Sequence, residues 1–336
     1  MKPHLVWVGH ASGASGLGRV AEQLLRRLVD AWRITVVSCA HAGPLTSHVS
    51  AQPGTDGTED PGREALPWRV VPGRFMYDWV GRIATRNVCR EDPPDVLVLM
   101  MDPQFVALYP KYVPPEVPVI AYMPIDSENV WQAQTLDWLA HGICFTSFSL
   151  RQLREGGYRG PGSLLGLGVD TALYRPLDKA MARWWLPAIN WRGEACRVPR
   201  DDFVIGNVNM NQPRKRQDIT LLAFQLLRQR LSACNVILYL HCARKDYGWD
   251  LGQLVEHWGL QDTVRFAPQG NSVPEHDMPW VYNALDVQVS TTQGEGFGLT
   301  HLEGMACGIP QVLPQYAGLA DWPGTSVYTV PARCCL

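Results

Sequence analysis

Two glutamates stand eight positions apart in a glycine-rich stretch near the end of the chain. Glu295 lies in the segment Gly-Glu-Gly-Phe-Gly that ends at Gly298, and Glu303 follows within a helix-like run. Glycine lets a backbone turn tightly and approach a ligand. A helix that begins near Gly298 would direct N–H groups and the positive end of its dipole at the loop, which favours phosphate. Carboxylates instead accept hydrogen bonds from hydroxyls. The stretch therefore predicts a site for a phosphate ester that also carries sugar hydroxyls.

The surrounding sequence has the elements of an open α/β sheet. A strand-like run at 286–290 precedes the glycines, and the exit after the helix reads Ala-Cys-Gly-Ile-Pro, ending at Pro310. With Glu295 and Glu303 separated by seven residues, this stretch resembles the acidic motif of nucleotide-sugar glycosyltransferases. It is most similar to the retaining enzymes of glycosyltransferase family 4. The alternative is an ordinary helix N-terminus with a stabilising glutamate nearby.

The resemblance implies an α/β protein of the GT-B fold, with two Rossmann-like parallel-sheet domains facing a cleft. We predict an N-terminal, acceptor-side domain at 1–172 and a C-terminal, nucleotide-sugar-binding domain at 173–336. Family members continue through further helices, so the second domain is predicted to be truncated. Near-continuous apolar runs, typical of buried parallel strands, lie at 5–9, 34–38, 96–100, 117–122, 143–146, 164–169, 203–208, 236–240 and 264–266.

A basic cluster at 214–216 follows the strand-like run 203–208 and precedes a predicted helix. In the family an arginine and, five residues later, a lysine clamp the phosphates of the donor. Lys215 matches the lysine, but the arginine position falls on Met210, and Arg214 is the candidate substitute. A solvated basic patch is the alternative interpretation, because adjacent charges usually face water.

The resemblance also implies roles in catalysis and in binding the donor. Glu303 would accept hydrogen bonds from the ribose hydroxyls, and Glu295 would accept them from the donor sugar. Glu295 and Lys215 are the predicted catalytic residues, because charge on the departing phosphate must be stabilised by fixed donors. The other predicted donor-binding residues, besides Arg214 and Glu303, are Gly296, Phe297, Gly298, Leu299 and Thr300.

Four residues of the N-terminal half are candidates for the acceptor side or the cleft. His10 ends the first strand-like run, and Gly16 and Gly18 follow in a predicted loop. With Gly13 they give Gly-x-x-Gly-x-Gly, which differs from the dinucleotide-binding spacing Gly-x-Gly-x-x-Gly. Asp126 follows a second strand-like run, at the edge where open sheets bind ligands. The alternatives are a structural histidine, tight-turn glycines and a helix N-cap at Asp126.

Composition excludes several other classes of protein. The chain has 336 residues, of which 46% are hydrophobic, and a net charge of −2, which argues against nucleic-acid binding. Its nine cysteines, including the adjacent Cys334 and Cys335, show no zinc spacing. There is no signal-like N-terminus and no apolar run of ~18 residues. We expect a cytoplasmic protein. The apolar stripe at 75–88 predicts a helix packed against the sheet, with a peripheral membrane contact as the alternative.

Residues 41–67 and 171–200 show no clear periodicity. The first segment is rich in Gly, Pro, Ser, Thr and Asp, and it predicts a mobile surface loop. The second contains Trp184, Trp185 and Trp191 with several prolines, and it predicts a helix followed by an irregular insert between the two domains.

The sequence thus predicts a glycosyltransferase that moves a sugar from a nucleoside-diphosphate sugar to an acceptor hydroxyl with retention of configuration. No cofactor and no metal are expected, since there is no Asp-x-Asp triplet. The acceptor, whether saccharide, lipid or protein, is not specified, and neither are the sugar and the base. A sugar-nucleotide epimerase and a non-catalytic nucleotide-sugar-binding protein are the alternatives.

Overall fold

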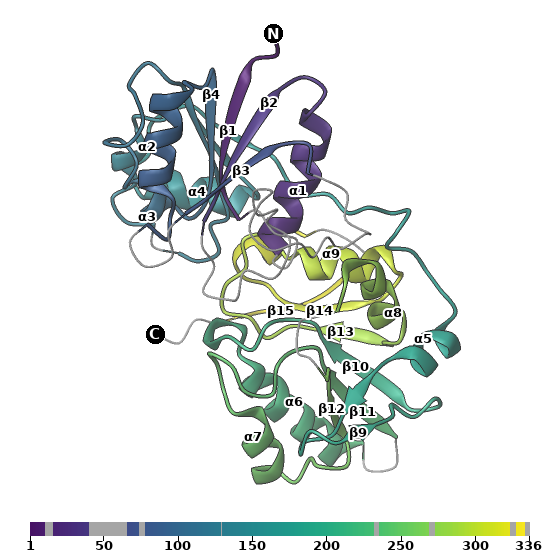
Figure 1. Ribbon diagram of the computed structural model, residues 1–336. Coiled ribbons are helices and arrows are strands. Elements are labelled where there is room, and N and C mark those ends of the chain that lie inside the picture. Colours follow the sequence, from purple (N-terminus) through teal and green to yellow (C-terminus); the bar gives the residue numbers. More distant parts are fainter. Residues whose placement is uncertain are drawn as a thin grey trace. The chain divides into compact units, whose positions relative to one another are not determined.

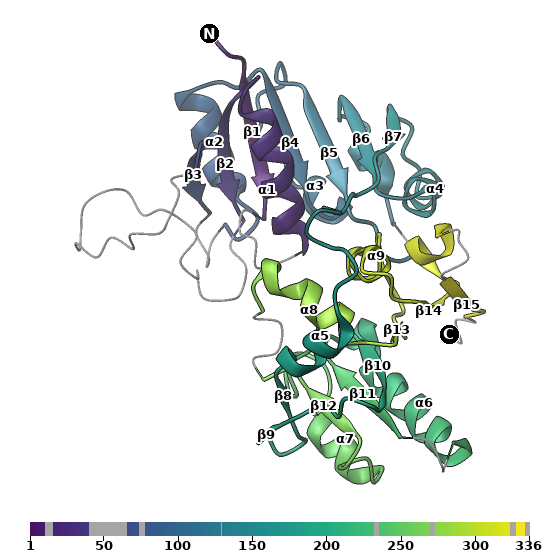
Figure 2. The same ribbon diagram turned by 90° about the vertical axis from the view of Figure 1, so that its right-hand side faces the viewer.

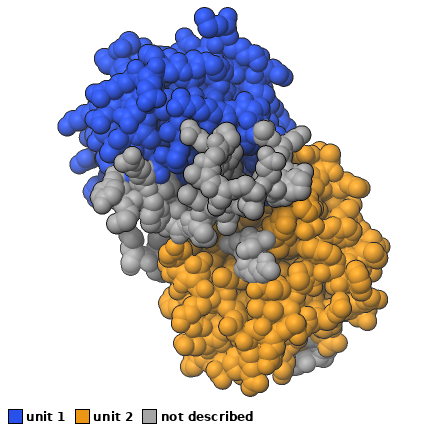
Figure 3. Space-filling view, in the orientation of Figure 1, with its two compact units in different colours: residues 1–166 blue, residues 167–336 orange. Residues whose placement is uncertain are grey.

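The computed structural model describes residues 1–10, 16–39, 66–73, 78–128, 130–231, 235–268, 273–322 and 327–332. The chain divides into two compact units, Met1–Gly166 and Leu167–Leu336 (Figure 3). The prediction placed this boundary after residue 172. Gly13, residues 41–65 of the predicted loop, Cys334 and Cys335 lie outside the described residues.

Unit 1 is built on a seven-stranded sheet in which every neighbouring pair is parallel. The order is β3-β2-β1-β4-β5-β6-β7, and Figure 2 shows these strands side by side. Helices α1 and α2 lie on opposite faces of the sheet (Figures 1 and 2). The strands are β1 (His4–Gly9), β2 (Arg33–Ser38), β3 (Arg69–Pro72), β4 (Val96–Met100), β5 (Val119–Met123), β6 (His141–Cys144) and β7 (Gly162–Leu164).

The strands of unit 1 form because both faces of the sheet are covered. All six residues of β1 are buried, as are the last five of β2. Such strands are apolar along their whole length instead of alternating. The helices that cover them are α1 (Gly16–Leu28), α2 (Arg82–Glu91), α3 (Pro103–Val106) and α4 (Ser147–Glu155), with the 3₁₀ turn η1 (Ala133–Leu136).

Three predictions for unit 1 need correction. Gly16 and Gly18 belong to the first turn of α1 and not to a loop. Helix α2 begins at Arg82, well inside the predicted stripe at 75–88, because Gly81 adopts a left-handed conformation (φ 77°) immediately before it. No helix begins at Asp126, since the next helical turn among the described residues is η1, so Asp126 is not an N-cap.

Unit 2 contains an eight-stranded sheet in the order β15-β14-β13-β10-β11-β12-β8-β9. Pairing is parallel from β15 to β12 and antiparallel at β8 and β9. The predicted irregular insert at 171–200 is therefore partly ordered as a short hairpin on the sheet edge. The strands are β8 (Ala188–Ile189), β9 (Ala195–Cys196), β10 (Phe203–Asn207), β11 (Val236–Leu240), β12 (Val264–Phe266), β13 (Val287–Val289), β14 (Gln311–Pro314) and β15 (Val327–Val330).

Two apolar cores lie in unit 2. One contains Tyr239 and Tyr282, and the other contains Phe224 and Leu238. The helices are α5 (Lys179–Trp185), α6 (Gln217–Arg230), α7 (Leu251–His257), α8 (Met278–Asn283) and α9 (Leu299–Ala306), and the 3₁₀ turns are η2 (Pro213–Lys215), η3 (Glu275–Asp277) and η4 (Ala317–Asp321).

Each sheet has a point where the direction of strand addition reverses. In unit 1 this point lies between β1 and β4, and in unit 2 it lies between β10 and β13. The loops that leave the carboxyl ends of two such strands run in opposite directions, which leaves a crevice where open α/β sheets bind ligands. The candidate site is therefore expected beyond the ends of β10 and β13.

Candidate functional site

The loops that follow β10 and β13 are joined by hydrogen bonds at the reversal point of unit 2. The Gln293 N–H donates to the Arg214 carbonyl (2.7 Å), and the Thr291 hydroxyl donates to the Arg216 carbonyl (2.7 Å). Arg216 itself has a left-handed backbone (φ 48°), a conformation that costs free energy in a residue other than glycine. The two loops therefore form one body, and the side chains on them are held in fixed relative positions.

Helix α9 begins at the predicted place. Gly298 is its N-cap and has a left-handed backbone (φ 94°), so the chain can turn sharply into the helix. A Cβ atom at this position would lie 2.6 Å from the Leu319 side chain. The first backbone hydrogen bond of the helix is donated by the His301 N–H to the Gly298 carbonyl (2.9 Å). The N–H groups of Leu299 and Thr300 precede it, where helices offer donors to an anion.

The two predicted catalytic side chains form an ion pair. Lys215 Nζ donates to Glu295 Oε2, and the side chains are only 8% and 16% exposed. Burial by itself would raise the pKa of the Glu295 carboxyl, but the charges of Lys215 and Arg214 outweigh burial, and the pKa lies below its ordinary value. Glu295 is therefore an ionised hydrogen-bond acceptor, and Lys215 is a cation next to the start of α9.

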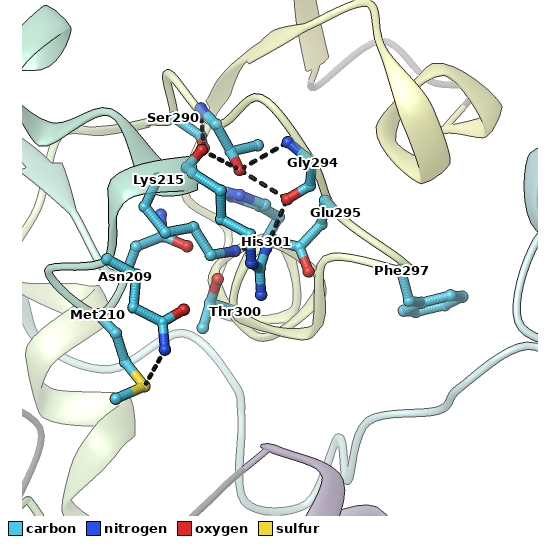
Figure 4. A network of polar contacts seen from close by, with 12 residues as sticks. Asn209, Met210, Lys215, Ser290, Gly294, Glu295, Phe297, Thr300 and His301 are labelled. Carbon is cyan, nitrogen blue, oxygen red and sulfur yellow. Dashed lines mark hydrogen bonds and ion pairs between the residues drawn. The ribbon is translucent and has the colours of Figure 1, made fainter. Parts of the chain in front are cut away.

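Arg214 is not placed as a simple replacement for the family arginine. Its Nη1 donates to the Gly294 carbonyl (2.6 Å), so part of the guanidinium holds the glycine loop in place. The side chain at the family's arginine position, Met210, is 40% exposed and brings no charge. Figure 4 shows Met210 on the side of the cluster nearest Asn209. The clamp on a diphosphate would therefore rest mainly on Lys215.

Glu303 lies inside the protein, one helical turn beyond the start of α9. It is 1% exposed, and its Oε2 accepts a hydrogen bond from the Tyr282 hydroxyl (2.5 Å). The predicted contact with ribose would be a further hydrogen bond to this carboxylate. The sequence analysis did not identify Tyr282, because a tyrosine in an apolar helix has no distinguishing pattern.

Phe297 points away from the ion pair (Figure 4). Its ring meets Trp322 edge to face, with centroids 5.2 Å apart, and its carbonyl accepts from Trp322 Nε1 (2.8 Å). The loop is also closed by Gly318, whose N–H donates to the Glu295 carbonyl (2.9 Å). Phe297 therefore anchors the loop, and Gly296 is buried beside it.

A buried polar cluster that the sequence analysis missed lies behind the ion pair. His301 of α9, Gln288 of β13 and Gln311 of β14 are at most 1% exposed. His301 Nδ1 lies 3.0 Å from Gln311 Oε1 and 3.2 Å from Gln288 Nε2. The available signal was two glutamines within otherwise apolar strands, since buried polar side chains are nearly always hydrogen-bonded.

The acceptor-side candidates of unit 1 are dispersed. His10 follows β1 directly, at the reversal point of its sheet, and is half-buried. Asp126 follows β5 two strands away and is also half-buried. Gly16 is exposed at the start of α1, and Gly18 is buried one turn into it, so neither provides the predicted loop. His10 thus lies at the reversal point, and Asp126 lies at the same carboxyl edge of the sheet, beyond β5.

The described part of the chain has neither a cluster of metal-binding side chains nor a membrane-spanning helix. No group of three or more His, Cys, Asp or Glu side chains there could hold a metal ion. No helix within the described residues combines the length and the apolar character needed to span a bilayer.

Comparison with known proteins gives a consistent result. Residues 202–333 match the family described as glycosyl transferases group 1. D-inositol 3-phosphate glycosyltransferase of Saccharomonospora viridis is 33% identical over 159 residues, which is 45% of this chain and 34% of that protein. Its counterpart in Salinispora arenicola is 31% identical over 158 residues, again 45% and 34% of the two chains. The chain thus spans about a third of the length of these curated relatives.

Solved structures resemble the whole chain. HepE from Anabaena, in complex with UDP and glucose, has a TM-score of 0.67 at 17% identity, covering 95% of this chain and 82% of that one. Sucrose-phosphate synthase from Thermosynechococcus elongatus has a TM-score of 0.69 at 16% identity, covering 98% and 86%.

The two parallel-sheet α/β units are those of the GT-B glycosyltransferases, as the sequence predicted. Within this fold, residues 202–333 are similar to the glycosyl transferases group 1 family, and the curated proteins that match the chain are named as glycosyltransferases.

Proposed function

We propose that the chain transfers a sugar from a nucleoside-diphosphate sugar to a hydroxyl of a saccharide, lipid or protein, with retention of anomeric configuration. The observation that carries this proposal is the Lys215–Glu295 ion pair beside the start of α9, at the reversal point of the unit 2 sheet. A cation and the backbone donors at a helix start suit a diphosphate, and the ionised carboxylate suits hydroxyls. The relatives named as glycosyltransferases support the same reaction class.

The proposed chemistry assigns each group one task. The bond between the anomeric carbon and the phosphate oxygen breaks while the bond to the acceptor oxygen forms, and the acceptor proton passes to the departing phosphate. Lys215 and the N–H groups of Leu299 and Thr300 stabilise the charge that develops on that phosphate. Glu295 acts as a hydrogen-bond acceptor for the sugar.

A non-catalytic nucleotide-sugar-binding protein is the second candidate. It is favoured by Met210, which replaces the phosphate-clamping arginine expected from the resemblance, and by the contact of Arg214 with Gly294. A single cation would bind a diphosphate but would stabilise the departing charge less. The two candidates differ in turnover and not in affinity.

The experiment uses the full chain with UDP-, GDP- and ADP-linked sugars. Binding is measured by calorimetry, and release of nucleoside diphosphate is measured with and without saccharide and lipid acceptors. Acceptor-dependent release, with a product of unchanged anomeric configuration by NMR, is the expected result. Tight binding without release would favour the second candidate, and no binding to any donor would contradict both. Turnover that persists in EDTA and recovery in the cytoplasmic fraction are further expectations of the proposal.

A further inference from the structure

His301 has a ring nitrogen without a hydrogen-bond partner. The side chain is 0% exposed, and Nε2 makes no hydrogen bond in the structure. A buried polar atom left without a partner destabilises a protein by about 1–3 kcal/mol. Native structures retain such atoms mainly where a ligand, water or catalytic step uses them. His301 lies in the first turn of α9, and the start of this helix is the proposed binding site for the sugar donor. The unpaired nitrogen is therefore best explained by a ligand.

The surrounding hydrogen bonds fix which nitrogen of His301 carries the proton. Gln311 Nε2 donates to the Ile309 carbonyl (2.8 Å), so the amide oxygen of Gln311 must face His301. That oxygen accepts only, and His301 Nδ1 must therefore be the donor. Gln288 Nε2 also lies close to Nδ1, but it can donate to the Thr300 carbonyl instead (3.3 Å), so it does not require Nδ1 to be an acceptor. In the neutral ring, Nε2 is consequently a bare acceptor.

His301 is neutral at physiological pH. Burial lowers its pKa to about 4, and the Glu295 carboxylate, which acts in the opposite direction, does not offset this. The other charge that acts on the ring is the Lys215 ammonium. His301 is also close to Glu295 in space, because a Cβ atom placed on Gly298 would lie 3.3 Å from His301 Cδ2 and 3.6 Å from Glu295 Cγ. The bare acceptor thus belongs to the same small volume as the ion pair (Figure 4).

We propose that His301 Nε2 is a hydrogen-bond acceptor for a hydroxyl of the transferred sugar, reached when the Lys215–Glu295 pair separates on donor binding. The inference rests on the proposed function. Lys215 turns to the incoming phosphates, Glu295 turns to the sugar, and the nitrogen behind them is uncovered. His301 is then a specificity-determining residue for the glycosyl part of the donor.

The unpaired atom is a hydrogen-bond acceptor, and this indicates which part of the donor it contacts. A bare imidazole nitrogen needs a hydrogen-bond donor as its partner. The diphosphate of a nucleotide offers acceptor oxygens at neutral pH, and the ribose hydroxyls are the predicted partners of Glu303. The hydroxyls of the transferred sugar are the remaining O–H donors of a nucleoside-diphosphate sugar. His301 therefore discriminates between a nucleoside-diphosphate sugar and the nucleoside diphosphate alone.

Two substitutions separate this role from a structural one. His301→Asn keeps an N–H group in the place of Nδ1 for Gln311, but it removes the acceptor. His301→Gln places an amide oxygen near the position of Nε2 and gives up the contact with Gln311. A merely structural histidine would be replaced better by Asn, and a sugar-contacting histidine would be replaced better by Gln.

Calorimetry of the full chain with UDP-, GDP- and ADP-glucose, and with the corresponding diphosphates, is the test. We expect His301→Asn to weaken binding of the accepted nucleotide sugar about 5- to 10-fold, the value of one hydrogen bond. Binding of the diphosphate alone should not change, and His301→Gln should recover part of the loss. In the wild type, the ¹⁵N resonance of Nε2 should report an unprotonated nitrogen and should move when the nucleotide sugar, but not the diphosphate, is added.

The outcomes distinguish the inference from the proposed function. The inference alone would be overturned if the wild type binds a nucleotide sugar and His301→Asn binds it with the same affinity. An Nε2 chemical shift that does not change when the nucleotide sugar is added would also overturn it. Equal losses for nucleotide sugar and diphosphate would make His301 a structural residue. A wild-type chain that binds none of the donors would overturn the proposed function, and the inference with it.

Discussion

The two units share a reversal of strand order but use their buried carboxylates differently. In unit 1 the buried carboxylate is Asp78, whose Oδ2 accepts the backbone N–H groups of Ile83 and Ala84 at the start of α2. In unit 2 the buried carboxylate Glu303 accepts from the side chain of Tyr282. The same unit holds Glu295 ionised against a lysine. One unit uses its buried charge to cap a helix, and the other concentrates charge at the edge of the sheet.

This difference shows that the strand–glycine–helix pattern does not by itself specify a site. Each unit contains a strand followed by glycines and a helix, yet Gly16 and Gly18 of unit 1 are helical residues. Gly298 of unit 2 has a backbone conformation that disfavours other residues. What marks the second junction as a site is the set of buried, mutually hydrogen-bonded polar side chains around it.

The largest effect is expected from the ion pair. Lys215→Ala should lower turnover about 100- to 1000-fold, because it removes a fixed donor to the departing phosphate. It should lower affinity for the free nucleoside diphosphate much less. Lys179→Ala is the matched control, since Lys179 also pairs with a carboxylate of unit 2, Asp286 (2.7 Å), but is 49% exposed. Steady-state kinetics and calorimetry measure both quantities, and equal losses of the two in Lys215→Ala would demote it to a binding residue.

The second largest effect is the dependence of folding stability on pH. Burial lowers the pKa of His241 and of His301 to about 4, so the unfolded chain binds more protons than the folded one between about pH 4 and 6.5. Stability is therefore fully present above that range and falls as the pH decreases through it. Each histidine contributes up to about 3 kcal/mol, at about 1.4 kcal/mol per pKa unit.

Denaturant unfolding at pH 7 and pH 5.5 measures this effect. His241→Gln and His301→Asn should each flatten the dependence on pH. Burial also lowers the pKa of His4 in unit 1. His4→Gln is therefore the comparison for that unit, and wild-type stability that rises on acidification would contradict the assignment of neutral histidines.

Removing the hydroxyl that bonds Glu303 should have the next largest effect. Tyr282→Phe should destabilise the protein by about 1–3 kcal/mol, because it removes a hydrogen-bond partner from a buried carboxyl group. It should also alter donor affinity, since Glu303 would then be less firmly oriented. Tyr328→Phe is a control, because that residue of unit 2 is 70% exposed. Chemical denaturation that finds the two variants equally stable would show that the hydrogen bond contributes nothing.

The smallest effects come from a pair of glycines, one in each unit. Gly298→Ala should destabilise the protein by about 1–3 kcal/mol, because alanine rarely adopts a left-handed backbone. Its Cβ would also meet Leu319. Gly16→Ala should be neutral or should stabilise by up to about 1 kcal/mol, since a Cβ there meets nothing within 4 Å in a helix. Thermal unfolding of both variants is the measurement, and the reverse order would contradict the contrast between the units.

Much of the fold followed from the sequence because its strands are continuous apolar runs. The prediction for 236–240 coincides with β11, and that for 264–266 coincides with β12. The start of α9 was predicted from glycine chemistry and was found one residue after Gly298. The hairpin β8–β9 was not predicted, because strands of two residues leave no periodicity in the sequence.

The candidate site could be predicted from the sequence only in part. Lys215 and Glu295 were named separately from their motifs, but their direct pairing joins residues 80 positions apart. Likewise, His301 stood inside the motif without a role, since its unpaired nitrogen depends on glutamines from β13 and β14. Spacing along the chain reports such partners only where a family pattern already relates them.

A crystal structure of the chain with a nucleoside diphosphate tests the central claim most directly. We predict phosphate oxygens within hydrogen-bond distance of the Leu299 and Thr300 N–H groups and of Lys215 Nζ, with Lys215 separated from Glu295. A diphosphate bound elsewhere, with Lys215 still paired to Glu295 and the start of α9 unused, would contradict the account.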